Sequence, residues 1–175
     1  MSKLQKLVLG ALLASLCCMG TLVIQIPSPM NGYVNMGDCF VLLSGWLLGP
    51  VYGFIAAGVG SALADLLAGY VHYVPATFLI KGLVALLAWT LNRLLSALPG
   101  KKLRLGRTVS ALAAEAVMVL GYFAWAALLF GEGLAAAASI PGNIVQGLAG
   151  VVLSALLMEV LQRTKLTKDF AGGEK

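Results

Sequence analysis

The segment from Asn35 to Leu83 reads NMGDCFVLLSGWLLGPVYGFIAAGVGSALADLLAGYVHYVPATFLIKGL. Most of its residues are apolar or small, yet it also carries Asp38, Asp65, His72 and Lys81. A charged side chain inside a membrane span costs at least about 2.5–3.5 kcal/mol unless it is paired or used. We therefore expect this segment to cross a membrane and to contain functional residues.

The composition of the whole chain predicts an integral membrane protein. Of its 175 residues, 60% are hydrophobic and 11% are charged, and the mean hydropathy is +0.94. A soluble domain has about 25% charged residues. At roughly 20 residues per helical span, the chain has room for about six helices and no separate soluble domain. The net charge of +5 lies mainly at the ends of apolar runs, so we predict no nucleic-acid binding.

We predict an all-α fold, a compact bundle of six transmembrane helices in which residues 1–175 form a single transmembrane domain. The polar stretch Pro27–Val34 is rich in turn formers, Gly49 and Pro50 end the second apolar run, and Pro75 suits the first turn of a helix. The second run covers only about 20 Å by helical rise, less than the ~30 Å of a bilayer core. The predicted spans are 6–26, 36–48, 51–70, 75–95, 108–130 and 140–162.

The distribution of Lys and Arg predicts the orientation of the bundle. With six spans, the N-terminus, the basic loop 93–107 and the C-terminal tail share one side, and all three carry cations. The loops 27–34, 71–74 and 131–139 contain no Lys or Arg. Because cytoplasmic loops are enriched in these residues, we expect both termini in the cytoplasm of a multi-pass plasma-membrane protein.

Polar side chains gather in the outer half of the predicted bundle. Asn143 and Gln146 lie three residues apart, so one helix face presents two amides that suit a neutral heterocycle, and aromatic rings nearby can stack on it. Trp46 could lie below such a pocket. We predict an outward-facing site for a small molecule, with substrate-binding residues Asn35, Asp38, Trp46, Asp65, Tyr73, Lys81, Asn143 and Gln146.

The charged residues leave several interpretations open. Asp65 and Lys81 both lie roughly 8–9 Å from the outer face, so we expect them to meet, either as a structural ion pair, as ligand contacts or as a proton relay. Asp38 could be a solvated N-cap or a ligand acceptor. His72 is expected in an exposed turn. Glu115 has no predicted partner.

No motif indicates catalysis. The chain has no GxxxxGK[ST], HExxH or GxSxG pattern, so we predict a protein that is not an enzyme and that has no catalytic residues. Three cysteines and one histidine give no metal-ligand spacing, and no cofactor is predicted. Uphill transport would need an energy source outside this chain.

The first span carries small residues at helical spacing: Gly10, Ala11, Ala14 and Ser15. Small-xxx-small pairs let another helix approach closely, so this face predicts either a partner interface or internal packing.

The pattern GD…GP.YG…G.GSALADLL.GY…P.TF.IKGL within Asn35–Leu83 resembles the substrate-binding S components of energy-coupling factor (ECF) vitamin transporters, in particular the riboflavin, hydroxymethylpyrimidine and pyridoxine branch. The resemblance implies a bacterial membrane protein that captures one such vitamin or precursor under the first outer loop. It also implies docking on a transmembrane scaffold (T) subunit driven by two cytoplasmic ABC-type ATPases.

In that family an alanine-xxx-alanine pattern on the first span meets the scaffold. The nearest matches here are Ala11-xxx-Ser15 and Gly10-xxx-Ala14, which keep the small size. The alternative function is a self-sufficient proton-coupled carrier that uses Asp65, Lys81 and Glu115 as a relay.

Overall fold

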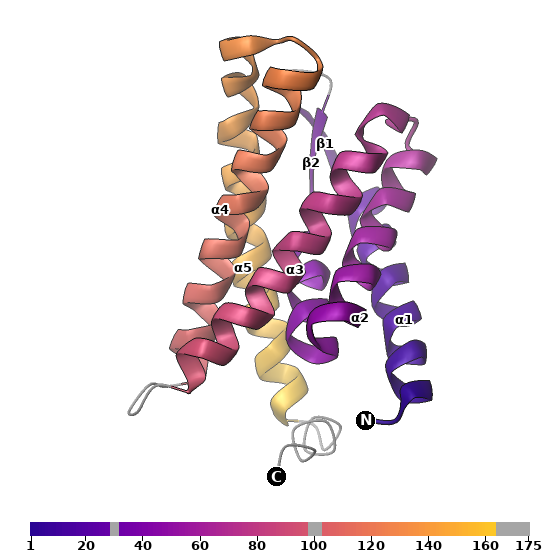
Figure 1. Cartoon of the computed structure of the whole chain (residues 1–175), viewed down its shortest axis with the longest axis vertical. Helices are drawn as coiled ribbons and strands as arrows, with labels where there is room; N and C mark the ends of the chain where they lie inside the picture. Colours follow the sequence, from indigo (N-terminus) through magenta and orange to yellow (C-terminus); the bar gives the residue numbers. More distant parts are fainter. Residues whose placement is uncertain (29–31, 98–102, 164–175) are drawn as a thin grey trace.

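The computed structural model describes residues 1–28, 32–97 and 103–163, and most of them are helical. Five of the helices are long and apolar enough to cross a membrane, and they pack into an elongated bundle (Figure 1). In chain order the elements are α1 (Lys3–Val23), β1 (Gln25–Ser28), β2 (Gly32–Asn35), α2 (Asp38–Leu67), the 3-10 helix η1 (Val71–Tyr73), α3 (Val74–Ser96), α4 (Leu103–Leu129), the 3-10 helix η2 (Gly133–Ser139) and α5 (Ile140–Arg163).

Helix α2 reverses direction in its middle. Gly49 has a φ of +81° and a ψ of −170°, outside the helical region, and Pro50 follows it. Glycine adopts a positive φ without steric cost, and proline suits the first turn of a restarting helix. A Cβ added at Gly53 would lie 2.7 Å from the carbonyl oxygen of Ser44, so the chain doubles back after the bend. α2 therefore has a first arm, residues 38–48, and an antiparallel second arm, residues 50–67 (Figure 1).

This reversal explains how the predicted spans relate to the observed helices. The predicted spans 36–48 and 51–70 are the two arms of α2, so the count of six separate helices is not confirmed. The predicted fifth span began at Thr108, but α4 begins at Leu103 and places Arg104 and Arg107 in a helix instead of a loop. Lys101 and Lys102 of the predicted basic loop lie outside the described residues.

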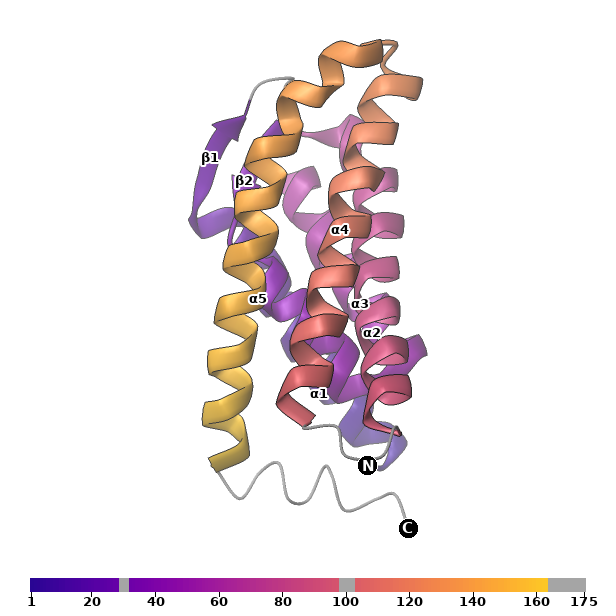
Figure 2. The same ribbon diagram turned by 90° about the vertical axis from the view of Figure 1, so that its left-hand side faces the viewer.

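The predicted polar loop Pro27–Val34 contains most of a two-stranded antiparallel hairpin. β1 pairs with β2 so that Gln25 faces Asn35 and Ile26 faces Val34. β2 contacts α1 and α5, and Figure 2 shows the strands beside the upper half of α5. The hairpin leads directly into the first arm of α2, so it fixes where that arm begins.

The elements divide the bundle into two ends (Figure 1). The hairpin end carries β1, β2, η1 and η2. The termini end carries the N-terminal end of α1, the bend of α2 and the C-terminal end of α5. The start of α1 and the end of α5 thus lie at the same end of the bundle. The predicted basic tail 164–175 lies outside the described residues, and the cytoplasmic location of the termini stays a prediction.

Small residues let the first three helices pack closely. A Cβ on Gly60 of the second arm would collide with the carbonyl oxygen of Ala14 on α1. A Cβ on Gly58 would lie 2.7 Å from the carbonyl oxygen of Phe78 on α3. Close backbone approach of this kind is typical of helices packed in membranes. The result is close packing of α1, α3 and the two arms of α2 around the segment that carries Asp38.

Candidate binding site

A buried ion pair joins the first turn of α2 to the middle of α3. The ammonium of Lys81 donates to Oδ1 of Asp38, and the two side chains are 3% and 1% exposed. The ammonium also lies 5.4 Å from the centroid of the Tyr122 ring on α4. The interpretation of Asp38 as a solvated N-cap is therefore wrong. The expected pairing of Lys81 with Asp65 is also wrong, because the first arm of α2 brings Asp38 to Lys81 at the same depth.

The amide of Gln146 on α5 ties this pair to the hairpin. Its Nε2 donates to Oδ2 of Asp38 at 2.7 Å, and its Oε1 accepts from the backbone N–H of Asn35 at 2.8 Å. The side chain of Asn35 accepts from the N–H of Gly37 at 2.9 Å and from Oγ1 of Thr21 at 3.4 Å. The structure thus brings together four predicted site residues, Asn35, Asp38, Lys81 and Gln146. Asn35 holds the turn into α2.

A second polar contact joins β2 to the second arm of α2. The hydroxyl of Tyr33 donates to Oδ1 of Asp65 at 2.5 Å, and its ring lies 4.8 Å from that of Tyr70. Burial, and then the neighbouring carboxylate of Asp65, raise the pKa of Tyr33. Asp65 is 5% exposed, and its Oδ2 has no hydrogen-bond partner among the described residues. The contact between Tyr33 and Asp65 therefore ties β2 to the second arm of α2.

Two residues that the sequence did not single out complete the cluster. Oγ1 of Thr77 and the hydroxyl of Tyr122 are 3.0 Å apart. The ring of Tyr122 lies 6.3 Å from that of Tyr73, a predicted site residue that is 9% exposed. Thr77 stands one helical turn before Lys81, and that spacing could have drawn attention to it.

Glu115 of α4 is buried next to the same cluster. It is 4% exposed, and neither carboxylate oxygen has a hydrogen-bond partner in the part of the chain that the structure describes. A Cβ added at Gly147 would lie 3.0 Å from Cβ of Glu115, so the carboxyl packs against α5 one residue after Gln146. A buried polar atom without a partner costs about 1–3 kcal/mol, and more if charged. Glu115 is therefore a destabilising group in the structure as described.

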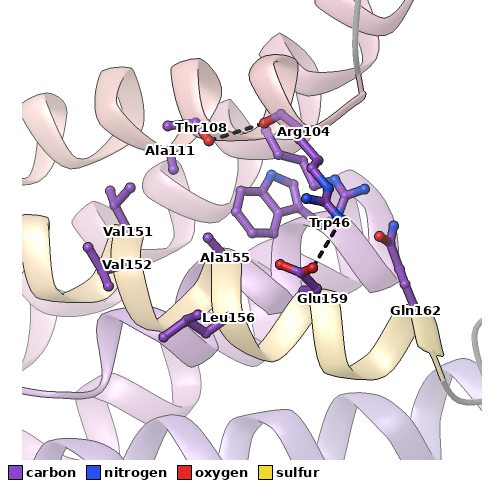
Figure 3. Close-up of a pocket in the computed structure, with 11 residues that line it drawn as sticks. Trp46, Arg104, Thr108, Ala111, Val151, Val152, Ala155, Leu156, Glu159 and Gln162 are labelled. Atoms are coloured by element: carbon purple, nitrogen blue, oxygen red, sulfur yellow. Dashed lines mark hydrogen bonds and ion pairs between the residues drawn. The ribbon is translucent and has the colours of Figure 1, made fainter.

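Trp46 lies outside this cluster. Its indole Nε1 donates to the carbonyl oxygen of Ala88 at 3.2 Å, and its ring lines a separate cavity between α4 and α5 (Figure 3). Trp46 follows Asp38 by eight residues, or about 12 Å of helical rise.

Two other residues named from the sequence lie beside the cluster or on the surface. Asn143 is half-buried on α5, one turn from Gln146. His72 is exposed, as predicted.

The small residues of α1 face two ways. Gly10 and Ala14 turn toward α2, where Leu48 and Gly60 lie. Ala11 and Ser15 are exposed, and Oγ of Ser15 donates to the carbonyl oxygen of Ala11 at 2.9 Å. Internal packing therefore accounts for Gly10 and Ala14, whereas the partner interface stays a prediction for Ala11 and Ser15.

This buried polar cluster is the candidate binding site. Within residues 1–28, 32–97 and 103–163, no three His, Cys, Asp or Glu side chains lie together as metal ligands would. The cluster offers carboxylates, an amide, hydroxyls and an ammonium to a polar molecule, and aromatic rings border it. Such groups orient a small ligand by hydrogen bonding and stacking.

Comparison with known proteins identifies the family and the fold. Residues 1–163 match the sequence model of the family described as ECF-type riboflavin transporter, S component. The chain belongs to this family of S components. A solved structure described as "Structure and mechanism of the S component of a bacterial ECF transporter" has a TM-score of 0.69 and 21% identity, and the match covers 93% of this chain and 98% of that one. It shows that the S-component fold is shared.

Two relatives add detail. The Thiamine precursor transporter HmpT of Lactococcus lactis subsp. cremoris (strain MG1363) is 30% identical over 151 residues, which cover 83% of this chain and 79% of that protein. A Pyrococcus woesei protein, named "Uncharacterized protein in gap 3'region", is 34% identical over 144 residues, covering 82% of this chain and 92% of its own. As a member of the S-component family, this chain is a membrane transport component of the vitamin-uptake type.

Proposed function

We propose that this S component captures a small water-soluble vitamin or vitamin precursor at the polar cluster beneath the β1–β2 hairpin. The observation that carries the proposal is the convergence of Asp38, Lys81 and Gln146, all buried, directly under the strand that ends at Asn35. Substrate would enter from the hairpin end, which faces outward if the cation-rich termini end is cytoplasmic.

The leading substrate class is a hydroxymethylpyrimidine-type precursor, with pyridoxine and riboflavin as the other members of the set. The name of one relative supports this order, and the acceptors of the cluster support the class of substrate as a whole. The relative HmpT is named for a thiamine precursor. The unpartnered oxygens of Asp65 and Glu115 are also acceptors suited to the N–H or O–H groups of a small heterocycle.

Delivery to the cytoplasm requires partners in this proposal. The S component would dock on a transmembrane scaffold subunit powered by two cytoplasmic ABC-type ATPases, with Ala11 and Ser15 of α1 in the contact. Uptake by membranes that contain all four subunits, and its loss when the scaffold is omitted, is the expected result.

A ligand screen tests the capture step. The purified full chain is heated with hydroxymethylpyrimidine, pyridoxine or riboflavin, and the unfolding midpoint is recorded. We expect at least one compound to raise the midpoint, because a ligand that binds only the folded state stabilises it. If none does so while a known S component responds to its own ligand, the proposal fails.

Substitutions of two glutamines on α5 test where the ligand binds. Gln146→Leu removes hydrogen bonds at the cluster, so we expect about tenfold or greater loss of affinity. Gln162→Leu makes the same change at the termini end and should keep wild-type affinity. Equal loss in both variants would place the binding site elsewhere.

The second candidate function is a proton-coupled carrier. The buried, unpartnered carboxyl of Glu115 beside the cluster favours it. It predicts uptake into proteoliposomes that contain this chain alone, driven by a pH gradient and abolished in Glu115→Gln. Uptake that occurs only with scaffold and ATPases excludes it.

A further inference from the structure

A second cavity lies at the termini end, away from the polar cluster. Its volume is about 330 Å³, and it is bounded by α4, α5 and the indole of Trp46 from the first arm of α2 (Figure 3). None of its lining residues belongs to the cluster around Asp38. Its occupant is therefore a separate question from that of the captured substrate.

Polarity is graded along this cavity. On α4 the lining changes from Arg104 and Arg107 near the helix start to Ala111, about 10 Å deeper by helical rise. On α5 it changes from Glu159 to Val152 over a similar length. The cavity is thus charged at the end of the bundle and apolar toward its middle, the order in which a phospholipid places its headgroup and its acyl chain.

The charge at the mouth of the cavity is positive. Arg104 and Arg163 share one carboxylate, that of Glu159, at 3.0 and 3.3 Å. Arg107 is 8% exposed, and it has no acidic partner among the described residues. With the amide of Gln162 turned so that its oxygen faces the guanidinium, Arg107 donates to it at 2.5 and 3.1 Å. A buried guanidinium with only a neutral partner remains electrostatically unbalanced.

We propose that this cavity binds an anionic phospholipid of the inner leaflet, with its phosphate at Arg104 and Arg107 and an acyl chain against Trp46 and Ala111. An arginine fork matches phosphate oxygens and is more easily desolvated than an ammonium. Basic pockets between transmembrane helices on the cytoplasmic side suit such headgroups. The proposal uses the cytoplasmic orientation of the termini end but not the identity of the captured substrate.

Thermal unfolding of the purified full chain in a neutral detergent tests the proposal. Phosphatidylglycerol is expected to raise Tm by about 3 °C or more over phosphatidylcholine, because a lipid that binds the folded state stabilises it. Arg107→Gln should lose most of this difference. Arg163→Gln, an exposed arginine at the same end, should keep it. An equal response in wild type and Arg107→Gln overturns the proposal.

Two further measurements keep the test decisive if Arg107→Gln does not fold. Ala155→Trp fills the apolar part of the cavity and should abolish the phosphatidylglycerol shift, whereas Val160→Trp, on an exposed face of α5, should not. Glycerophosphate without acyl chains should give little shift. A full shift with glycerophosphate, or retention of the lipid shift in Ala155→Trp, would show an anion site without a lipid chain and overturn the proposal.

Discussion

Two ion pairs in this protein use the same chemistry in opposite surroundings. Asp38 and Lys81 are 1% and 3% exposed, and Asp38 also accepts a hydrogen bond from the amide of Gln146. Glu159 and Arg104, at the termini end, are 36% and 77% exposed, and Glu159 is also shared with Arg163. Breaking a buried pair strands a charge at a cost of about 3–5 kcal/mol, whereas an exposed pair contributes about 0–1 kcal/mol.

This difference shows which ion pair connects more elements of the fold. The inner pair connects α2 and α3, and Gln146 extends it to α5 and the hairpin. One carboxylate thereby fixes the relative positions of four elements. The outer pair connects α4 and α5 near solvent, where water can replace either partner. We expect mutations at the two sites to differ several-fold in their effect on stability.

Lys81→Ala should have the largest effect. It leaves Asp38 buried without its cation, so the free energy of unfolding should fall by about 3–5 kcal/mol. Denaturant unfolding in detergent measures the change. The double variant Asp38→Asn with Lys81→Met should recover part of the loss, since both charges are gone. If the double variant Asp65→Asn with Lys81→Met recovers a similar part of the loss, Lys81 pairs with Asp65 instead.

Tyr33→Phe should have the next largest effect. It removes the donor to Oδ1 of Asp65, and an unsatisfied buried acceptor costs about 1–3 kcal/mol. Tyr70→Phe is the matched control, because no hydrogen bond of its hydroxyl is described. Unfolding midpoints of the two variants give the comparison. Equal midpoints would mean that the Tyr33 contact contributes little.

Glu115→Leu should change stability in the opposite direction. It replaces an unpartnered buried carboxyl by an apolar side chain of similar size, so the free energy of unfolding should rise by about 1–3 kcal/mol. If the carboxyl serves the substrate, ligand affinity should fall in the same variant. Higher stability with unchanged affinity would remove Glu115 from the binding site.

Glu159→Gln should have the smallest effect. It breaks both exposed contacts of Glu159, yet the free energy of unfolding should change by less than about 1 kcal/mol. The change should shrink further at high salt, because exposed charges are screened. A loss comparable to that of Lys81→Ala would remove the distinction between the two pairs.

The parts of the fold that could be read from the sequence are those set by local patterns. Apolar runs place α1, α3 and α5, and the Gly49-Pro50 break marks the bend in α2. The hairpin was expected only as a loop, because its strands have four residues each and β1 contains Pro27. Strands so short give too few residues to show alternation.

The sequence predicted which end of the bundle holds the polar side chains but not which of these side chains form pairs. The predicted topology put Asp38, Lys81 and Gln146 in the outer half of the bundle, and the structure brings these three side chains together. The sequence could not tell which helix faces meet, so Lys81 was assigned to Asp65. It also placed Trp46 at the site, although that residue lies about 12 Å further along the first arm. Thr77 and Tyr122 were missed because their hydroxyls look ordinary in an apolar sequence.

The bend at Gly49 also determines how far the hairpin lies below the end of the second arm of α2. Counted from the bend, the first arm of α2 rises about 16 Å and the second arm about 27 Å. The β1–β2 hairpin, which leads into the shorter arm, therefore begins roughly two helical turns below the top of its neighbour. Strand edges at membrane depth must be satisfied by protein. Any motion that lifts the hairpin for a solute must first transfer the Asn35 N–H from Gln146 to a new acceptor.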